Sequence, residues 1–222
     1  WKTMDAGDTW TPYSLWNNFY NNPSYPNYVH ADHHVMAFRP GNPDDLLMST
    51  DGGVFLSRNA TAEQPVVVEK NHGFNTLQYY TAAIHPEAGN HYFFAGAQDN
   101  GTVRYNRPGG PVNIFDNVSY GDGTFCFVDE DEPEIQITGS QFNYVYVTTD
   151  GMADGQPDFY LSQFRTGVFL NPMDYDSEKN ILYANNCDFY GMGPDSLVRM
   201  FGFKNVPSIN RIFLNTGTDV PF

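Results

Sequence analysis

The strongest constraint on the fold is a pattern of short apolar runs and turns that recurs at a nearly constant interval. Aligning the tripeptides Phe38-Arg39-Pro40, Ile84-His85-Pro86, Val128-Asp129-Glu130 and Leu170-Asn171-Pro172 gives offsets of 46, 44 and 42 residues. Each tripeptide is followed by a polar turn and then by a second apolar run: "LLMST", "YFFAGA", "IQITGS" or "ILYANN". A unit of about four strands in roughly 45 residues has the size of one propeller blade.

The residues between the apolar runs predict strands rather than helices. The 20 glycines and 15 prolines recur every few residues, and no stretch of helical length has apolar positions at helical spacing. An all-β chain with short strands is therefore expected. A β-sandwich would also contain many short strands but would not give this internal register, so we predict a β-propeller made of four-stranded antiparallel blades.

The repeat also predicts how the chain is organised. Residues 1–222 form a segment of one propeller domain, with residues 1–15 as the end of a preceding blade. The blades are expected at about 34–69, 78–116, 124–163 and 167–214. About four blades and a leading hairpin make an arc, so we expect the missing blades to come from the remainder of the same polypeptide.

The charge balance limits the partners. The chain has 26 acidic and 11 basic residues, a formal charge of -15, which repels phosphate backbones and anionic membrane surfaces. No run approaches the roughly 20 apolar residues needed to span a bilayer. We therefore expect no nucleic-acid partner and no membrane insertion.

The cysteine content predicts no disulfide framework. Cys126 lies in the first strand of one unit, and Cys187 lies in a turn of the next. A disulfide needs a narrow Cα separation, which this placement does not favour. Two free, buried thiols are expected.

The motif Thr-x-Asp-x-Gly-x-Thr-Trp at residues 3–10 has weaker copies later in the chain. A short carboxylate accepts hydrogen bonds from N–H groups of its own turn, a glycine takes a positive φ, and a tryptophan packs across the hairpin. The motif supplies no acid–base partner, so a structural role is predicted. The residues concerned are Thr3, Asp5, Gly7, Trp10, Ser57, Asn59, Thr148 and Asp150.

These turns resemble the Asp-box of the BNR-repeat propellers, which include sialidases, sortilin-type receptors and xyloglucan-degrading endoglucanases. The motifs "DGGV", "QDNGT" and "GDG" in successive units resemble a group of large secreted bacterial proteins, many of which end in a sorting domain. The resemblance covers nearly the whole chain. It implies a propeller that is secreted or held at the cell surface, and it specifies no activity.

Propeller topology separates the motifs between two faces. The turns between second and third strands share one face with the crossovers between blades, while the Asp-boxes lie on the other. A ligand-binding ring is thus predicted on the first face, near Tyr79, Tyr80 and Tyr120. Its members are His30, Asp32, His34, Asp51, Gln98, Asp99, Asn100, Asp122 and Asp188.

Several of these motifs have two interpretations. On an extended strand, "HADHH" would place His30, Asp32 and His34 on one face, able to bind a metal or to form a buried hydrogen-bonded network. "QDNG" could bind calcium through Asp99, but Asn-Gly is also a common hairpin turn. Asp32 and Asp99 are the candidate metal ligands, with calcium as the candidate cofactor.

Two enzyme classes and a binding module are the alternatives for the function. A sialidase needs clustered arginines, and those here are scattered and lack the Arg-Ile-Pro signature: positions 39, 58, 104, 107, 165, 199 and 211. A xyloglucanase-like glycoside hydrolase needs two carboxylates across a cleft, for which Asp32 and Asp99 are the candidates. An acidic, aromatic face can instead bind glycans, calcium or another protein without a reactive pair.

The preferred hypothesis is a non-catalytic extracellular propeller segment that serves adhesion, scaffolding or glycan binding. Its expected partners are the rest of the polypeptide and a glycan or a surface or secretion protein. The alternative is the glycoside hydrolase. Asn59, Asn100 and Asn117 are glycosylation sequons, which matter only in a glycosylating secretory pathway.

Overall fold

The structure is a computed structural model of the chain. It describes residues 1–16, 27–74, 76–106, 115–153, 155, 157, 159–162, 166–187, 196–203 and 217–221. The chain divides into two compact units, Trp1–Asn75 and Thr76–Phe222.

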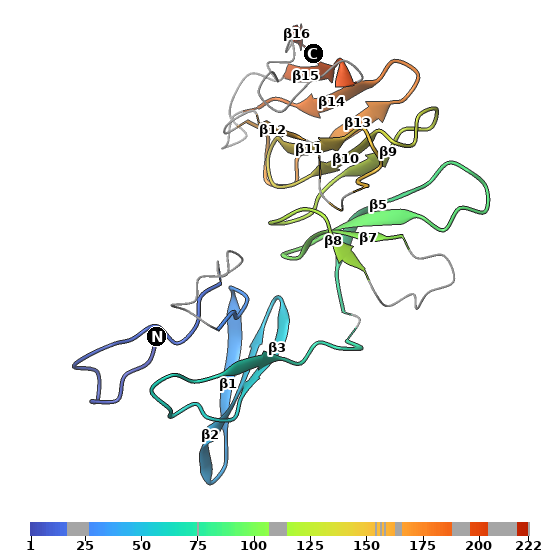
Figure 1. Ribbon diagram of the computed structural model, residues 1–222. Coiled ribbons are helices and arrows are strands. Elements are labelled where there is room, and N and C mark those ends of the chain that lie inside the picture. Colours follow the sequence, from blue (N-terminus) through green and yellow to red (C-terminus); the bar gives the residue numbers. More distant parts are fainter. Residues whose placement is uncertain are drawn as a thin grey trace. The chain divides into compact units, whose positions relative to one another are not determined.

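The first unit contains one four-stranded antiparallel sheet with its strands in sequence order (Figure 1). Its strands are β1 (His33–Arg39), β2 (Asn42–Thr50), β3 (Gly53–Ser57) and β4 (Val67–Glu69). A hairpin closed by the Lys2–Thr11 bridge precedes the sheet, and Leu15 forms a parallel bridge with Tyr28.

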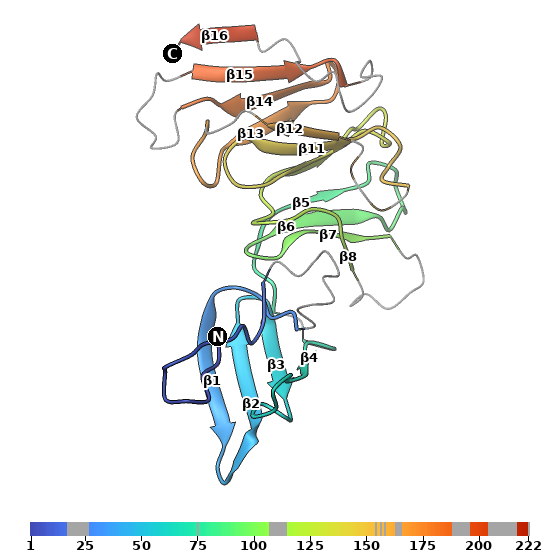
Figure 2. The same ribbon diagram turned by 60° about the vertical axis from the view of Figure 1, so that its left-hand side comes forward.

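The second unit contains three such sheets, again with strands in sequence order. The second sheet comprises β5 (Tyr79–Ile84), β6 (Phe93–Ala97), β7 (Gly101–Tyr105) and β8 (Asp116–Asn117). The third comprises β9 (Cys126–Val128), β10 (Gln136–Gly139), β11 (Tyr144–Thr148) and β12 (Phe159–Ser162). The fourth comprises β13 (Met173–Asp176), β14 (Ile181–Asn185), β15 (Ser196–Phe201) and β16 (Gly217–Pro221). Figure 2 shows these three sheets following one another along the unit.

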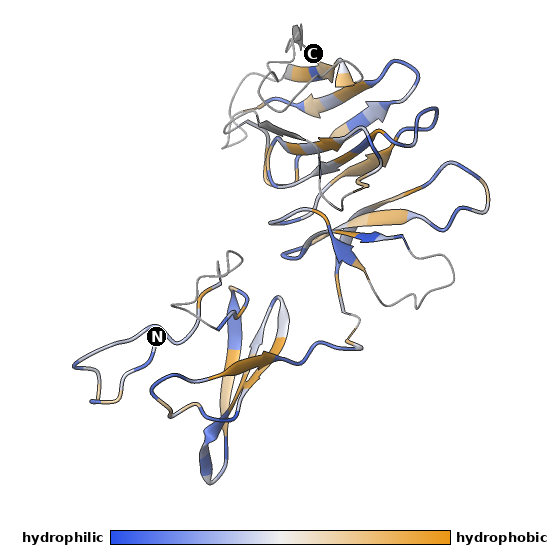
Figure 3. Cartoon of the chain, viewed as in Figure 1, coloured by the Kyte–Doolittle hydropathy of each residue, from blue (hydrophilic) through white to orange (hydrophobic). Residues whose placement is uncertain are grey.

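The prediction of an all-β chain built from four-stranded antiparallel sheets is confirmed. Figure 3 shows hydrophobic colours mainly along the strands and hydrophilic colours at many of the turns between them. The described part of the chain contains no helix with the length and hydropathy of a membrane span.

Buried and exposed side chains alternate along the strands of the first unit, and the buried ones form its core. In β2, Leu46 and Met48 are buried while Leu47 between them is exposed, because successive side chains of a strand point to opposite faces. Phe55 of β3 packs beside Met48 and meets Tyr28 edge-on, with ring centroids 6.1 Å apart. These contacts fix one face of the sheet against the segment that precedes it.

In the second unit the core lies between successive sheets. Ile137 and Val147 of the third sheet share one buried cluster with Leu182 and Met200 of the fourth. Phe94 of the second sheet clusters with Cys126, which belongs to the third. Face-to-face packing thus buries side chains that one sheet alone could not cover.

Cys126 and Cys187 are both free and buried, as the sequence predicted. Thr81 Oγ1 lies 3.3 Å from the Cys126 sulfur, and Asn185 Nδ2 donates to the Cys187 sulfur over 3.1 Å. Burial raises the pKa of the Cys126 thiol, so the thiol stays protonated and weakly reactive.

The connector between the second and third sheets approaches both of them very closely. The connector is residues 119–124, "SYGDGT". The Gly123 N–H donates to the Ala97 carbonyl over 2.9 Å, and the Thr124 N–H donates to the Gly139 carbonyl over 2.9 Å. A Cβ atom on Gly96 would lie 2.0 Å from the Thr124 carbonyl oxygen, so only glycine fits there.

We predict that Gly96→Ala destabilises the protein by about 1–3 kcal/mol, because the backbone it would strike cannot rotate away. Chemical denaturation measures the loss. Gly89→Ala is the control, since nothing lies within 4 Å of its Cβ position and its φ of +84° adds only backbone strain. A smaller loss for Gly96→Ala than for Gly89→Ala would contradict the close approach.

Candidate functional site

The most closely connected group of predicted site residues surrounds Asp122, in the connector of the second unit. Asp122 is buried, and its Oδ1 accepts a hydrogen bond of 3.1 Å from the backbone N–H of Asp99 in the β6–β7 turn. Its Oδ2 accepts a second bond from Nε2 of Gln141 in the β10–β11 turn. We call Asp99, Tyr120, Asp122, Ser140 and Gln141 the Asp122 junction.

The rest of the junction is held by further polar contacts. The Ser140 hydroxyl donates to the Tyr120 carbonyl over 3.1 Å and also contacts Gln141 Oε1. A Cβ atom on Gly121 would lie 2.5 Å from that same Oε1. The Gly121–Gly123 stretch of the connector is therefore packed closely on its neighbours.

The "QDNG" stretch forms the tight β6–β7 turn. Asp99 and Gly101 both have left-handed φ values, 59° and 66°. Asn100 Nδ2 donates to the Gln98 carbonyl over 2.9 Å, and Asn117 Nδ2 donates to the Asn100 carbonyl over 3.0 Å. The stretch therefore joins β6 and β7 as a turn. That Asp99 binds calcium stays a prediction.

Aromatic side chains lie beside the junction. Burial raises the pKa of Tyr80, and the charges of Asp122 and Asp99 raise it further. Tyr120 of the connector is 52% exposed. The junction thus presents aromatic surface next to fixed carboxylates.

In the first unit the sheet end carries a histidine–carboxylate pair. Nε2 of His34, at the start of β1, contacts Oδ1 of Asp51 in the β2–β3 turn. The His34 side chain is 61% exposed, so solvent screens the pair and it adds little to stability. His30 packs against the same turn, since a Cβ atom on Gly52 would lie 2.3 Å from its ring.

The expected single extended strand through "HADHH" is wrong. Asp32 has a φ of 57°, and β1 begins only at His33. A left-handed residue turns the chain, so His30, Asp32 and His34 do not alternate along one strand. Aspartate tolerates this conformation better than most residues, and the sequence pattern did not reveal it.

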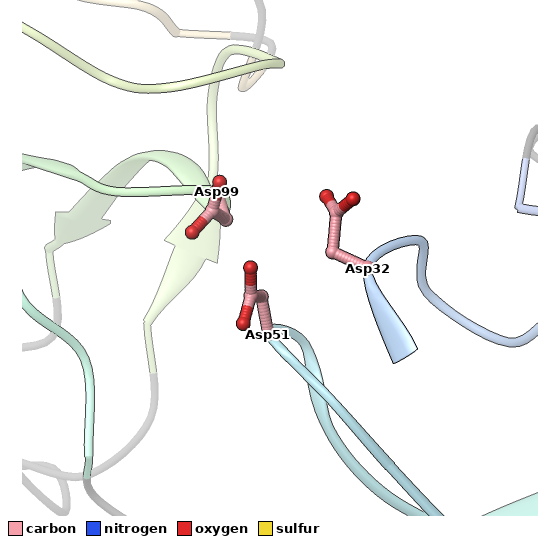
Figure 4. A group of neighbouring side chains, drawn as sticks. All are labelled: Asp32, Asp51 and Asp99. Carbon is pink, nitrogen blue, oxygen red and sulfur yellow. The ribbon is translucent and has the colours of Figure 1, made fainter. Parts of the chain in front are cut away.

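Figure 4 labels the three aspartates Asp32, Asp51 and Asp99. Asp32 precedes β1 and Asp51 follows β2, so both lie at the same end of the first sheet. Asp99 belongs to the second unit. Asp32 and Asp99, the candidate pair for a hydrolase, therefore belong to different units, and the pair stays a prediction. Asp188 lies outside the described residues.

The hydrogen bonds expected of the Thr3–Asp5 turn are present. Thr3 Oγ1 donates to Asp5 Oδ1 over 2.8 Å and accepts the Gly7 N–H over 2.8 Å. The Thr9 N–H donates to Asp5 Oδ1 over 2.9 Å. Gly7 has a φ of 104°, and Trp10 Nε1 donates to the Gly7 carbonyl over 3.1 Å. Each polar group of the motif is used within the turn.

The Thr148 copy of this turn repeats these contacts, and the Ser57 copy repeats part of them. Thr148 Oγ1 donates to Asp150 Oδ1 over 2.7 Å and accepts the Met152 N–H over 3.2 Å. The Ser57 hydroxyl donates to Asn59 Oδ1 over 3.4 Å, and Asn59 Oδ1 also accepts the Val66 N–H over 2.8 Å. In both copies a hydroxyl group donates to a carboxylate or amide oxygen two residues further along the chain, so the motif stabilises its own turn.

Sequence reasoning missed the role of Arg104. This residue of β7 is buried, and its NH1 donates to the Met152 carbonyl over 2.7 Å, in the turn that follows Thr148. Its NH2 lies 3.5 Å from Asp116 Oδ2. An isolated arginine between strand residues gives no signal of this contact, because its partner is a backbone carbonyl distant in sequence.

Comparison of the sequence with protein-family models and with curated proteins finds no match. The function is therefore argued from the residues and their geometry.

We predict that Asp5 titrates far below an ordinary aspartate. Hydrogen bonds from the Thr9 hydroxyl, the Thr9 N–H and the Thr3 hydroxyl lower its pKa from 3.8 to about 2. Because the pKa is depressed in the folded state, its contribution to stability is present above pH 4 and is lost as the pH falls towards 2. An NMR titration of the Asp5 carboxyl measures this, and Thr9→Ala should move the midpoint upwards. A midpoint near 4 in the unmodified protein would contradict the hydrogen bonds.

We predict that Asp122→Ala destabilises the protein by about 1–3 kcal/mol, because two partly buried donors lose their acceptor. Urea denaturation measures the effect. Glu87→Ala, at an exposed carboxylate of the β5–β6 loop, is the control and should change stability little. Equal losses in the two variants would show that the junction does not hold the sheets.

Proposed function

We propose that this chain is a segment of a β-propeller that recognises a ligand without catalysis. The observation that carries the proposal is a cavity of about 890 Å³ in the second unit, lined by the first strands of all three of its sheets. Thr81 of β5, Cys126 of β9 and Tyr175 of β13 contribute to it. In a propeller the first strand of every blade faces a common axis, so this shared lining supports the arrangement.

The junction supports recognition rather than hydrolysis. Glycoside hydrolysis needs two carboxyl groups flanking the bond, one of them able to give up a proton. Both oxygens of Asp122 already accept hydrogen bonds, from Asp99 N–H and from Gln141. A carboxylate held in this way positions two turns, which suits a structural part in a binding site.

The proposed ligand is a calcium ion or a neutral glycan bound at the turns of the second unit. Asp99 and the exposed ring of Tyr120 lie beside the buried Asp122. Carboxylate and carbonyl oxygens suit calcium, and aromatic faces with polar neighbours suit sugars. The formal charge of -15 disfavours an anionic ligand.

The biological setting follows from the resemblance stated above. The resemblance implies a secreted or cell-surface protein, and adhesion or scaffolding is the proposed role. In such a protein these turns would bind a glycan or a surface or secretion protein. The remainder of the same polypeptide would supply the other blades. Asp99 is partly exposed and Tyr120 is exposed, so a partner in solution can reach both.

Titration calorimetry with calcium and with neutral oligosaccharides tests the proposal, alongside reducing-sugar release from β-glucan, xyloglucan and a sialoside. We expect binding without turnover, and binding weakened by Asp99→Asn. Glu87→Gln, which removes one exposed charge elsewhere in the unit, should bind as the unmodified protein does.

Sugar release that disappears in Asp32→Ala or Asp99→Ala would replace this proposal with the glycoside hydrolase. Equal loss of binding in Asp99→Asn and Glu87→Gln would show a general charge effect and would argue against a site at the turns.

A further inference from the structure

We propose that the first unit contains a separate pocket for one ring of a neutral saccharide, between the leading segment and the first sheet. The pocket has a volume of about 520 Å³, within the range of small-molecule sites. The inference rests on the proposed recognition function, but it needs neither the propeller arrangement nor the turns of the second unit.

Aromatic side chains form the walls of this pocket. Trp1, Tyr13 and Trp16 come from the leading segment, and Phe38 comes from β1. Trp16 is 65% exposed and Phe38 is 59% exposed, although both are large apolar groups. A pyranose ring presents a face of C–H groups, which packs on an aromatic ring and removes such surface from water.

The floor of the pocket belongs to the packed core. Leu46 and Met48 of β2 line it together with Val29, and all three are buried. Phe38 pairs with Leu46 and Met36 pairs with Met48 in the β1–β2 register, so the wall and the floor are fixed by one hairpin. A ligand would therefore meet a surface that is already formed, which lowers the cost of binding.

Polar groups stand at one side of the pocket. His30, Asp32 and His33 lie next to one another in sequence and all line it. An imidazole nitrogen and a carboxylate can both form hydrogen bonds with hydroxyl groups, which a sugar presents at its edge.

The same groups argue against other occupants. An acyl chain or an apolar peptide would cover Asp32 and His33 without giving them hydrogen-bond partners, which is costly. An anionic ligand would meet Asp32, and the ammonium of Lys2 is directed to the carbonyls of Ala62 and Glu63. A neutral sugar ring would pack its C–H face on the aromatic walls, and its hydroxyl groups would form hydrogen bonds at the polar side.

Titration calorimetry on the whole chain tests the pocket, with neutral glucose-, xylose-, mannose- and galactose-based oligosaccharides as probes. At least one should bind, and Trp16→Ala and His33→Ala should each weaken binding about tenfold or more. Trp10→Ala is the matched control: Trp10 is also an exposed tryptophan of the leading segment, at 56%, but it does not line the pocket.

Two further measurements keep the outcomes distinct. Near-UV circular dichroism checks that each variant folds, and a bound sugar should protect tryptophan fluorescence from acrylamide in Trp10→Ala but not in Trp16→Ala. Binding that survives both Trp16→Ala and His33→Ala, or no binding by any probe, would overturn the pocket. Loss of binding only in Asp99→Asn would leave the proposed function standing and remove this inference.

Discussion

The structure of the second unit depends on one close backbone approach, where the connector between its first two sheets passes over both. The amide of Gly123 reaches the Ala97 carbonyl, and the buried carboxylate of Asp122 takes one donor from each neighbouring turn. Burying a carboxylate costs free energy unless donors satisfy it. Because those donors come from Asp99 and Gln141, the connector links a turn of the second sheet to a turn of the third. This interaction positions the proposed binding turns.

The repeated hydroxyl–carboxylate turns show how a local motif acquires a longer-range role. At Thr3 the hydrogen bonds close within one hairpin and reach no other sheet. At Thr148 the same contacts hold Met152 in a left-handed conformation, and its carbonyl then accepts from the buried Arg104. A buried guanidinium needs such acceptors, so the turn links the second and third sheets. The two copies are alike in chemistry but differ in what surrounds them.

Ligand binding is proposed at two places in this chain, and different interactions would hold the ligand at each. The turns of the second unit offer fixed oxygens beside aromatic rings, which suits a cation or a hydroxyl-rich ligand. The pocket of the first unit is built mainly from apolar walls, with His33 and Asp32 at one side. The formal charge of -15 disfavours an anionic ligand at either place.

The sequence by itself determined the local structure. Apolar alternation and turn residues predicted the four-stranded sheets, and the Thr3–Asp5 turn was predicted because its partners lie within a few residues. Tertiary structure alone decided which turns meet. Asp122 was predicted as a site residue, but its donors lie 19 and 23 positions away. Arg104, the left-handed Asp32 and the aromatic pocket gave no pattern, because each depends on a backbone conformation or on surfaces brought together only when the sheets form.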